Sequence, residues 1–385
     1  MLTMATKRQI ITKQKAKYLR SGKKDKSIIL SALTETTGLT REHLIRVLSR
    51  KYEYEEKKIK SGRGRKPIYG MPHKQLLVEV WELLDYPSSR RLESSMKAVL
   101  DNLEEHGHKV LDPTFKKEML MLSHGTMDRL LRNDRKSIKP FGLSTTKPGS
   151  LLKNQIPIRR GTDWDDQRPG FFEIDLVAHC GSSTRGEYVN TLDCTDIASG
   201  WTECAAIRNK ARIHTLEATK RIRSRLPFPL LGIDSDNGSE FINEHFLYYC
   251  KDNNLCFTRS RPNHSNDSCY VEQKNWSVVR HSVGYCRYEG QEVVDLLNQF
   301  YELLRLYNNF FLPSQKLIYK ERQGGKVSKK HDCAATPYRR LMLDPNVDEL
   351  DKKVLESTFH SIDLLQIRKN MNKLLAKIKS LSLGY

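Results

Sequence analysis

The sequence predicts an α/β core, a mixed sheet with helices, preceded by all-helical helix-turn-helix domains. Five short β-rich apolar runs alternate with helical segments between residues 171 and 260. A helix, a glycine and a second helix follow one another near the N-terminus, and basic residues are concentrated in the same half of the chain. At 385 residues the chain is long enough for several domains.

The charge of the N-terminal half favours a polyanionic partner. The formal net charge is +20, and residues 1–170 contribute 36 Lys and Arg against 20 Asp and Glu. Basic residues that neutralise phosphates release condensed counterions, so such a surface binds nucleic acid. A solvated basic surface that only aids solubility is the alternative.

Residues 1–70 are expected to form a helix-turn-helix DNA-binding domain with a basic linker. Gly38 ends one helix, and Thr40 caps the next, which runs from Arg41 to about Tyr52. In this helix Leu44, Val47 and Leu48 face the core. The free face then presents basic side chains to phosphates and guanine edges, namely Arg41, Arg46 and Arg50. A small helical bundle with a solvated basic face is the alternative.

The linker SGRGRKP (residues 61–67) offers a second DNA contact. Arg63 and Arg65 can run along a narrow minor groove, where the potential is most negative. A plain basic linker fits the same residues.

The rest of the chain divides by composition. Residues 71–136 read as a second helical, helix-turn-helix-like domain, with contact to DNA left open, and the proline-rich residues 137–165 as a basic linker. Residues 166–310 form the α/β core. Residues 311–385 supply a basic arm, predicted as a hairpin around Gly324-Gly325, and C-terminal helices.

Three acidic residues of the core mark a candidate metal site. Asp175 lies within the strand at 171–179, Asp236 follows a buried strand, and Glu272 begins a helix. The Asn237-Gly238 turn after Asp236 is expected to adopt positive φ. Hard cations such as Mg²⁺ take carboxylate ligands and substrate phosphates. Buried carboxylates also need a cation or hydrogen bonds.

Spacing alone does not establish this site. Asp236 and Glu272 are separated by 35 residues, but a chain with 46 acidic residues contains many such pairs by chance. Asp234 competes with Asp236 as the second ligand, and Asp236 is preferred because the turn exposes it.

The helix of Glu272 also offers DNA contacts. Asn275, Trp276 and Arg280 follow Glu272 at i+3, i+4 and i+8 and are expected on one face, and Lys274 adds a further cation.

IDSDNGSEF, followed by HSNDSCYVEQKN, resembles the catalytic core of DDE transposases and retroviral integrases. STTKPGSLLK, DWDDQRPGFFEIDLVAH and TPYRRLM are similar, more narrowly, to bacterial insertion-sequence transposases with an integrase-type core. The resemblance covers roughly residues 140–345. It implies a ribonuclease H-like fold with strand order β-β-β-α-β-α-β-α. It departs from retroviral integrases in lacking a His/Cys zinc module, and Ser268-Cys269 stands where these transposases more often have Asn-Ala or Asn-Cys.

The resemblance implies that Asp175, Asp236 and Glu272 are the catalytic metal ligands and that Asn275 lies near the substrate. Two Mg²⁺ ions, or Mn²⁺ in their place, are the implied cofactors. The implied partners are double-stranded DNA, as transposon ends and target, and further copies of the chain in a homodimer or higher homo-oligomer.

These observations predict a DDE transposase that binds transposon ends, cleaves DNA and transfers strands. The alternatives are a catalytically inactive, transposase-derived DNA-binding regulator and a structure-selective nuclease of the same fold. No G-x-x-x-x-G-K-[ST] string is present, so no nucleotide cofactor is expected. No apolar run approaches a membrane span, so we expect a cytoplasmic, nucleoid-associated prokaryotic protein.

Overall fold

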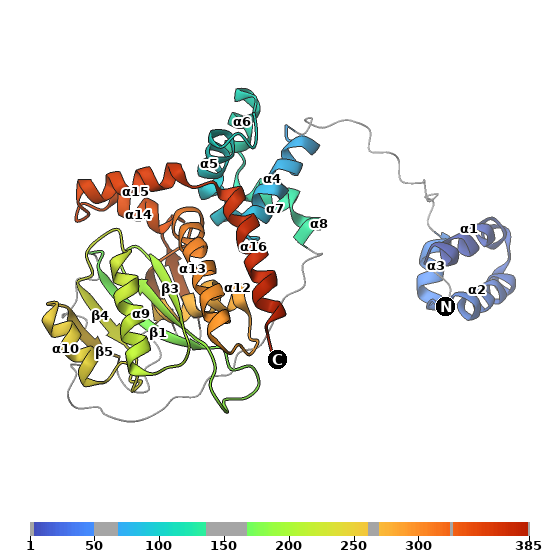
Figure 1. Cartoon of the computed structure of the whole chain (residues 1–385). Coiled ribbons are helices and arrows are strands. Elements are labelled where there is room, and N and C mark those ends of the chain that lie inside the picture. Colours follow the sequence, from blue (N-terminus) through green and yellow to red (C-terminus); the bar gives the residue numbers. More distant parts are fainter. Residues whose placement is uncertain (1–3, 50–67, 136–167, 261–268, 324–325, 384–385) are drawn as a thin grey trace. The chain divides into compact units, whose positions relative to one another are not determined.

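The chain forms two compact units, Met1–Ile68 and Tyr69–Tyr385 (Figure 1). The computed structural model describes residues 4–49, 68–135, 168–260, 269–323 and 326–383. The expected linkers at 61–67 and 137–165 fall outside these residues.

The first unit is a three-helix domain made of α1 (Met4–Arg20), α2 (Lys23–Thr37) and α3 (Arg41–Ser49). Gly38 ends α2 at φ 65°, a left-handed conformation that only glycine adopts readily, and its N–H donates to Thr34 O. Leu44 and Leu48 are fully buried and Val47 packs beside them, as predicted. The core of this unit consists of Ile11, Tyr18, Leu30, Leu33, Leu44 and Leu48.

The second unit is built on a mixed five-stranded sheet of order β3-β2-β1-β4-β5. Its strands are β1 (Phe171–Ala178), β2 (Asn190–Asp196), β3 (Thr202–Ile207), β4 (Gly232–Ser235) and β5 (Cys256–Arg259). The first three pair antiparallel, whereas β1, β4 and β5 pair in parallel. The parallel crossovers run through α9 (Arg212–Ser224) and α10 (Glu244–Asp252), and α11 (Cys269–Lys274) follows β5. The predicted strand order β-β-β-α-β-α-β-α is therefore confirmed.

The helices before and after the core pack into the same unit. These are α4 (Met71–Leu83), α5 (Ser89–Glu105), α6 (Pro113–Leu120), α7 (His124–Leu130), α8 (Arg132–Arg135), α13 (Gln291–Phe311), α14 (Pro337–Leu343), α15 (Glu349–Ser361) and α16 (Leu364–Ser380). Ser95 on α5 donates to Phe311 O at 3.0 Å, and Asn102 donates to Ile362 O at 2.6 Å. The helical region expected as a separate domain at 71–136 thus shares one hydrophobic core with the sheet.

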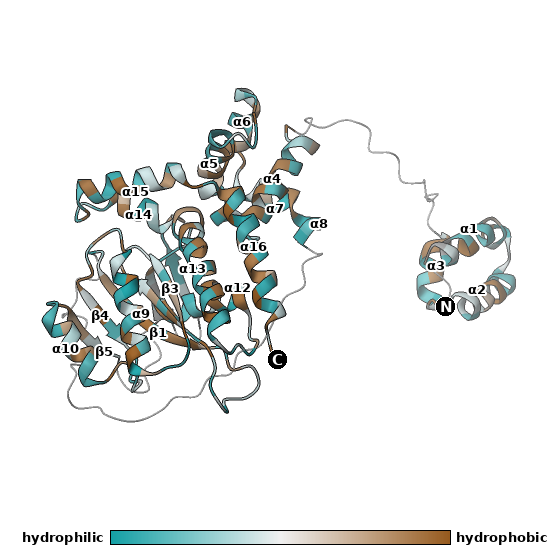
Figure 2. Ribbon diagram, in the orientation of Figure 1, coloured by the Kyte–Doolittle hydropathy of each residue, from teal (hydrophilic) through white to brown (hydrophobic). Residues whose placement is uncertain are grey.

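Polar and apolar residues alternate along the outer helices α15 and α16, as amphipathic helices require (Figure 2). Figure 1 shows α16 beside α13, and the two helices are in contact. Among the residues that the structure describes, no helix combines the length and the apolar character needed to cross a lipid bilayer.

The expected basic hairpin is present. Strands β6 (Leu317–Gln323) and β7 (Lys326–His331) form a separate two-stranded antiparallel sheet. Its base is held by Arg340, whose Nη1 lies 2.5 Å from Asp332 Oδ2. Lys329 and Lys330 on β7 are exposed to solvent. Contact between this hairpin and DNA stays a prediction.

A buried histidine at the end of β1 links the sheet to α13. His179 Nε2 lies 2.8 Å from Thr191 Oγ1, which in turn lies 2.7 Å from the hydroxyl of Tyr301. Its Nδ1 has no hydrogen-bond partner among the described residues. Burial, and to a lesser extent the charge of Arg280, lowers the pKa of His179 to about 3.

The folded pKa of His179 lies below the value of the unfolded chain, so this group contributes stability above about pH 6.5 that is lost as the pH falls. Between pH 7 and pH 5 we expect the wild type to lose about 2 kcal/mol more free energy of unfolding than His179→Gln. Urea titrations followed by tryptophan fluorescence measure this, because all four tryptophans lie beyond residue 68.

His245→Gln is the matched control, since His245 is exposed on α10. This variant is expected to keep the wild-type pH dependence. Equal pH dependence in wild type and His179→Gln would contradict the prediction.

Candidate active site

The strand register gathers acidic side chains on one face of the sheet. Side chains two residues apart share a face, so Glu173 and Asp175 project from the same side of β1. Asp175 pairs with Asp193 on β2, and Glu173 pairs with Asp234 on β4. Asp236, two residues after Asp234, therefore continues the same face at the level of Asp175.

Asp175 is the centre of this acidic face. Its Oδ1 accepts from Leu176 N at 2.7 Å and its Oδ2 from Asn275 Nδ2 at 2.6 Å. Burial, together with the charges of Asp236 and Glu272, raises the pKa of Asp175 to about 7. The structure thus places Asp236 and Glu272 within electrostatic range of Asp175.

Asp236 is fixed by the turn that follows β4. Its Oδ1 accepts from Gly238 N at 2.9 Å, an Asx-type turn. The expected positive φ is wrong, because neither Asn237 nor Gly238 has one. A Cβ at position 238 would lie 2.9 Å from Asp236 Oδ1 and 2.7 Å from Glu240 Cδ, so close approach explains the glycine. Burial raises the pKa of Asp236, opposed by the Gly238 hydrogen bond and the charge of Lys210.

Asp234 is engaged elsewhere. Its side chain is buried, and Thr258 Oγ1 donates to its Oδ1 at 2.5 Å. Asp236 is half-buried at the end of the same strand. This contrast favours Asp236 over Asp234 as a metal ligand.

Glu272 is exposed on α11, and partial burial raises its pKa. The helix continues through a π-helical turn, η1 (Asn275–Arg280), into α12 (His281–Val283). A π-helical turn has more residues than an α-helical turn, so Asn275, Trp276 and Arg280 do not share the helix face on which they were expected. Asn275 turns to Asp175, whereas Arg280 donates to Ala178 O at 2.7 Å.

Asp193 is buried on β2 opposite Asp175, and Lys274 of α11 lies within electrostatic range of it. Burial raises the pKa of Asp193 to about 8, with Lys274 opposing and Asp175 adding to the shift. Burial likewise lowers the pKa of Lys274 to about 8. Lys274, expected on DNA, is half-buried and lies within electrostatic range of Asp193. Trp276 remains on the surface with 54% of its area exposed.

Sequence reasoning missed Glu173 and Asp193. Glu173 was detectable, because it stands two residues before Asp175 in the same predicted strand. Asp193 was not, because its proximity to Asp175 depends on the register between β1 and β2.

The donor set of Asp175, Asp236 and Glu272 fits a hard divalent cation. All three ligands are carboxylates, and their mutual repulsion is the kind of strain that bound Mg²⁺ relieves. Within the described residues, no three His, Cys, Asp or Glu side chains are close enough together to hold a metal ion. The three carboxylates must therefore draw together for a cation to bind.

The predicted DNA-contacting arginines are only partly described. Arg41 is exposed on α3, but its guanidinium is tied to α2 through Ser27 Oγ at 2.7 Å and Ser31 Oγ at 3.2 Å. Arg46 is exposed, with Nη2 3.3 Å from His43 Nδ1. The remaining three, Arg50, Arg63 and Arg65, lie outside the described residues.

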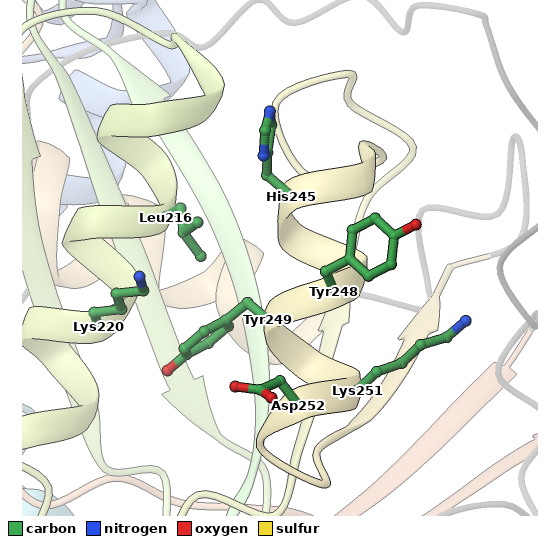
Figure 3. Close-up of a pocket in the computed structure, with 7 residues that line it drawn as sticks. All are labelled: Leu216, Lys220, His245, Tyr248, Tyr249, Lys251 and Asp252. Carbon is green, nitrogen blue, oxygen red and sulfur yellow. The ribbon is translucent and has the colours of Figure 1, made fainter.

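A groove of about 640 Å³ lies between α9 and α10 (Figure 3). Its lining side chains are Leu216, Lys220, His245, Tyr248, Tyr249, Lys251 and Asp252. None of the three predicted acids lines it, so it is distinct from the candidate active site.

The model of the "Integrase core domain" family matches residues 165–265. The "Uncharacterized protein y4rM" of Sinorhizobium fredii (strain NBRC 101917 / NGR234) is 38% identical over 339 residues. That match covers 88% of this chain and 96% of the relative.

Solved retroviral structures also align with part of the chain. The HTLV-2 integrase catalytic core domain, described as dimeric and in complex with magnesium, is 16% identical, with a TM-score of 0.29; the match covers 38% of this chain and 91% of that one. The catalytic core domain of BIV integrase is also 16% identical at a TM-score of 0.29, covering 44% and 91%. The simian T-cell lymphotropic virus intasome with PP2A regulatory subunit B56 gamma is 15% identical at 0.28, covering 47% and 59%.

Removing one charge from the acidic face is expected to stabilise the metal-free protein. The folded pKa of Asp236 lies above its usual value, so its ionised form opposes folding at pH 8. Asp236→Asn should gain about 1 kcal/mol, or about 2–4 °C in Tm, without divalent cations. Added Mg²⁺ should raise the Tm of the wild type and leave that of Asp236→Asn unchanged.

Glu217→Gln provides the control, because Glu217 is an exposed acid on α9. It should behave as the wild type in thermal unfolding with and without Mg²⁺. A wild-type Tm that does not change when Mg²⁺ is added would argue against the metal site.

Proposed function

The chain belongs to the integrase-core family, and from that premise we propose that it is a DDE transposase. It binds transposon ends and catalyses Mg²⁺-dependent cleavage and strand transfer. The observation that carries the proposal is the position of Asp175, which lies within electrostatic range of Asp236 and Glu272 and accepts a hydrogen bond from Asn275, three residues after Glu272. Placing three carboxylates from a strand, a turn and a helix near one another costs free energy, and metal binding would offset that cost.

Asp175, Asp236 and Glu272 would hold two Mg²⁺ ions, or Mn²⁺ in their place. When bound, this pair supplies activation of the attacking oxygen and stabilisation of the leaving oxygen at a phosphodiester. Asn275 orients the carboxylate of Asp175 by donating to Oδ2. The Gly238 N–H orients Asp236 in the same way.

The proposed reaction has a hydrolytic step followed by a transesterification step. In the first step water attacks a phosphorus at the transposon end, a new P–O bond forms, and the bond to the 3′ oxygen breaks to leave a 3′-hydroxyl. In the second step that hydroxyl attacks a target phosphodiester, which releases a target 3′-hydroxyl. The bond count is conserved in strand transfer, so no nucleotide cofactor is needed.

The DNA partners would be held mainly by basic groups outside the acidic face. The first unit carries exposed Arg46 on α3, and the hairpin carries exposed Lys329 and Lys330. Two transposon ends must be processed together, so we propose that the chain acts as a homodimer or larger homo-oligomer on double-stranded DNA.

Neutralising any one of the three ligands is expected to abolish chemistry. Asp175→Asn, Asp236→Asn and Glu272→Gln should each lower strand transfer by more than about 100-fold, since outer partners of metal ligands alone contribute about 10–100-fold. Binding of DNA should persist, because these side chains do not contribute positive charge. Oligonucleotides from the DNA that flanks the coding region serve as substrates, with cleavage and joining read on gels.

Asp234→Asn is the matched comparison, because Asp234 lies on β4, two residues before Asp236. Activity in Asp236→Asn together with loss in Asp234→Asn would reassign the second ligand. A wild type that binds ends but never cleaves would identify a regulator, and cleavage of scrambled ends at the same rate would identify a nuclease.

Arg46→Ala is expected to weaken DNA binding without affecting the acidic face. Loss of one phosphate contact reduces the slope of log affinity against log salt by about 1. Fluorescence anisotropy of an end-derived duplex over a salt series measures this slope. Lys24→Ala removes an exposed cation from α2 and should leave the slope unchanged; an unchanged slope in Arg46→Ala would remove α3 from the interface.

A further inference from the structure

A buried carboxylate joins β1 to the helix that bears Glu272. Glu173 is only 1% exposed, and its Oε2 accepts hydrogen bonds from Tyr270 N at 2.9 Å and Val271 N at 3.1 Å. The first amides of a helix have no partner within the helix itself. Glu173 satisfies two of them from a neighbouring strand, where a carboxylate also interacts favourably with the positive end of the helix.

Two more acids of the same sheet face lie on strands that contact the same helix. Asp175 accepts from Asn275, and Asp193 lies within electrostatic range of the half-buried Lys274. The contacts to Glu173 precede Glu272 in the chain, and those of Lys274 and Asn275 follow it. Glu272 is thus exposed, with Gln273, between two docked segments of one helix.

We propose that Glu173 is a positioning residue that fixes the helix of Glu272 on the strand of Asp175, so that the two ligands reach one cation. This inference rests on the proposed function. Glu173 is not itself a ligand, because its carboxylate is buried and accepts the helix amides. One strand then supplies both a ligand, Asp175, and the anchor for another.

The geometry of the helix supports this role. The π-helical turn η1 begins at Asn275, directly after the segment that Glu173 caps. Such turns are rare and occur frequently at functional sites. Here the N-terminal segment is fixed by Glu173 and the start of the turn by Asp175, and both anchors lie on β1.

The test compares Glu173→Ala and Glu173→Gln in the full chain. The alanine variant removes the acceptor, whereas glutamine keeps a carbonyl oxygen that can accept from the same amides. Asp112→Ala is the matched control, because Asp112 Oδ2 caps α6 through Thr114 N at 2.9 Å and Phe115 N at 3.0 Å. This control removes a cap of the same kind on a helix that bears none of the three ligands.

Two measurements are made on each variant. Hydrogen–deuterium exchange reports protection of residues 269–283, and Mg²⁺ alone is titrated while Tm is followed. Glu173→Ala should exchange faster in that segment and raise the half-saturating Mg²⁺ concentration about 10-fold. Glu173→Gln should recover most of both effects. Asp112→Ala should lower Tm while leaving the segment and the Mg²⁺ midpoint as in the wild type.

The outcomes separate the inference from the proposed function. Unchanged exchange in Glu173→Ala overturns the inference, and so does faster exchange with a wild-type Mg²⁺ midpoint, which would make Glu173 merely structural. A wild type whose Tm does not respond to Mg²⁺ contradicts the proposed function itself, and the inference falls with it.

Discussion

The second unit is organised around acidic side chains that lie close together on one face of its sheet. Glu173, Asp175 and Asp193 share a face with Asp234 and Asp236, where burial penalises each ionised carboxylate. Each of these acids has a partner nearby. Backbone amides of the helix that begins at Cys269 donate to Glu173, and Asn275 donates to Asp175. Thr258 donates to Asp234, the Gly238 N–H donates to Asp236, and the charge of Lys274 lowers the pKa of Asp193. Three of these five partners belong to one helix, so packing of that helix against the sheet also supplies the partners of Glu173, Asp175 and Asp193.

In this arrangement folding destabilises the ionised forms of the three proposed ligands, because the pKa of each is raised. With its pKa raised to about 7, Asp175 is only partly ionised at neutral pH in the absence of a cation. Metal binding would require that proton to leave, so affinity for the cation and ionisation of the site are coupled. Glu173 and Asp234 instead accept hydrogen bonds from donors that a cation does not displace. Asp193, which is not a proposed ligand, shares the penalty of burial, since its pKa is raised to about 8.

The fold predicted from the sequence is confirmed and the three acids stay a proposal, but the sequence did not reveal the partners of their side chains. Strands around Asp175 and Asp236 were visible as apolar runs, and the helix of Glu272 followed from the resemblance to known cores. The Asn237-Gly238 turn closes through the Asp236 side chain because Glu240 crowds position 238, which local turn propensity does not reveal. The positions of Lys274 and Arg280 were missed because a π-helical turn and the register of β1 with β2 are set by tertiary packing.

The proposed activity needs both acidic metal ligands and basic DNA-binding residues, and these lie mostly in different parts of the chain. A face built from carboxylates repels the phosphates on which it would act, and it attracts them only when cations are bound. The excess of basic residues therefore cannot sit among the ligands without competing for them. It lies instead mostly in residues 1–170, while the remaining residues, which contain the acids, are close to balanced with 30 basic and 26 acidic side chains. Long-range attraction to DNA and short-range capture of the cation are thus carried by different residues, and each can be strong without weakening the other.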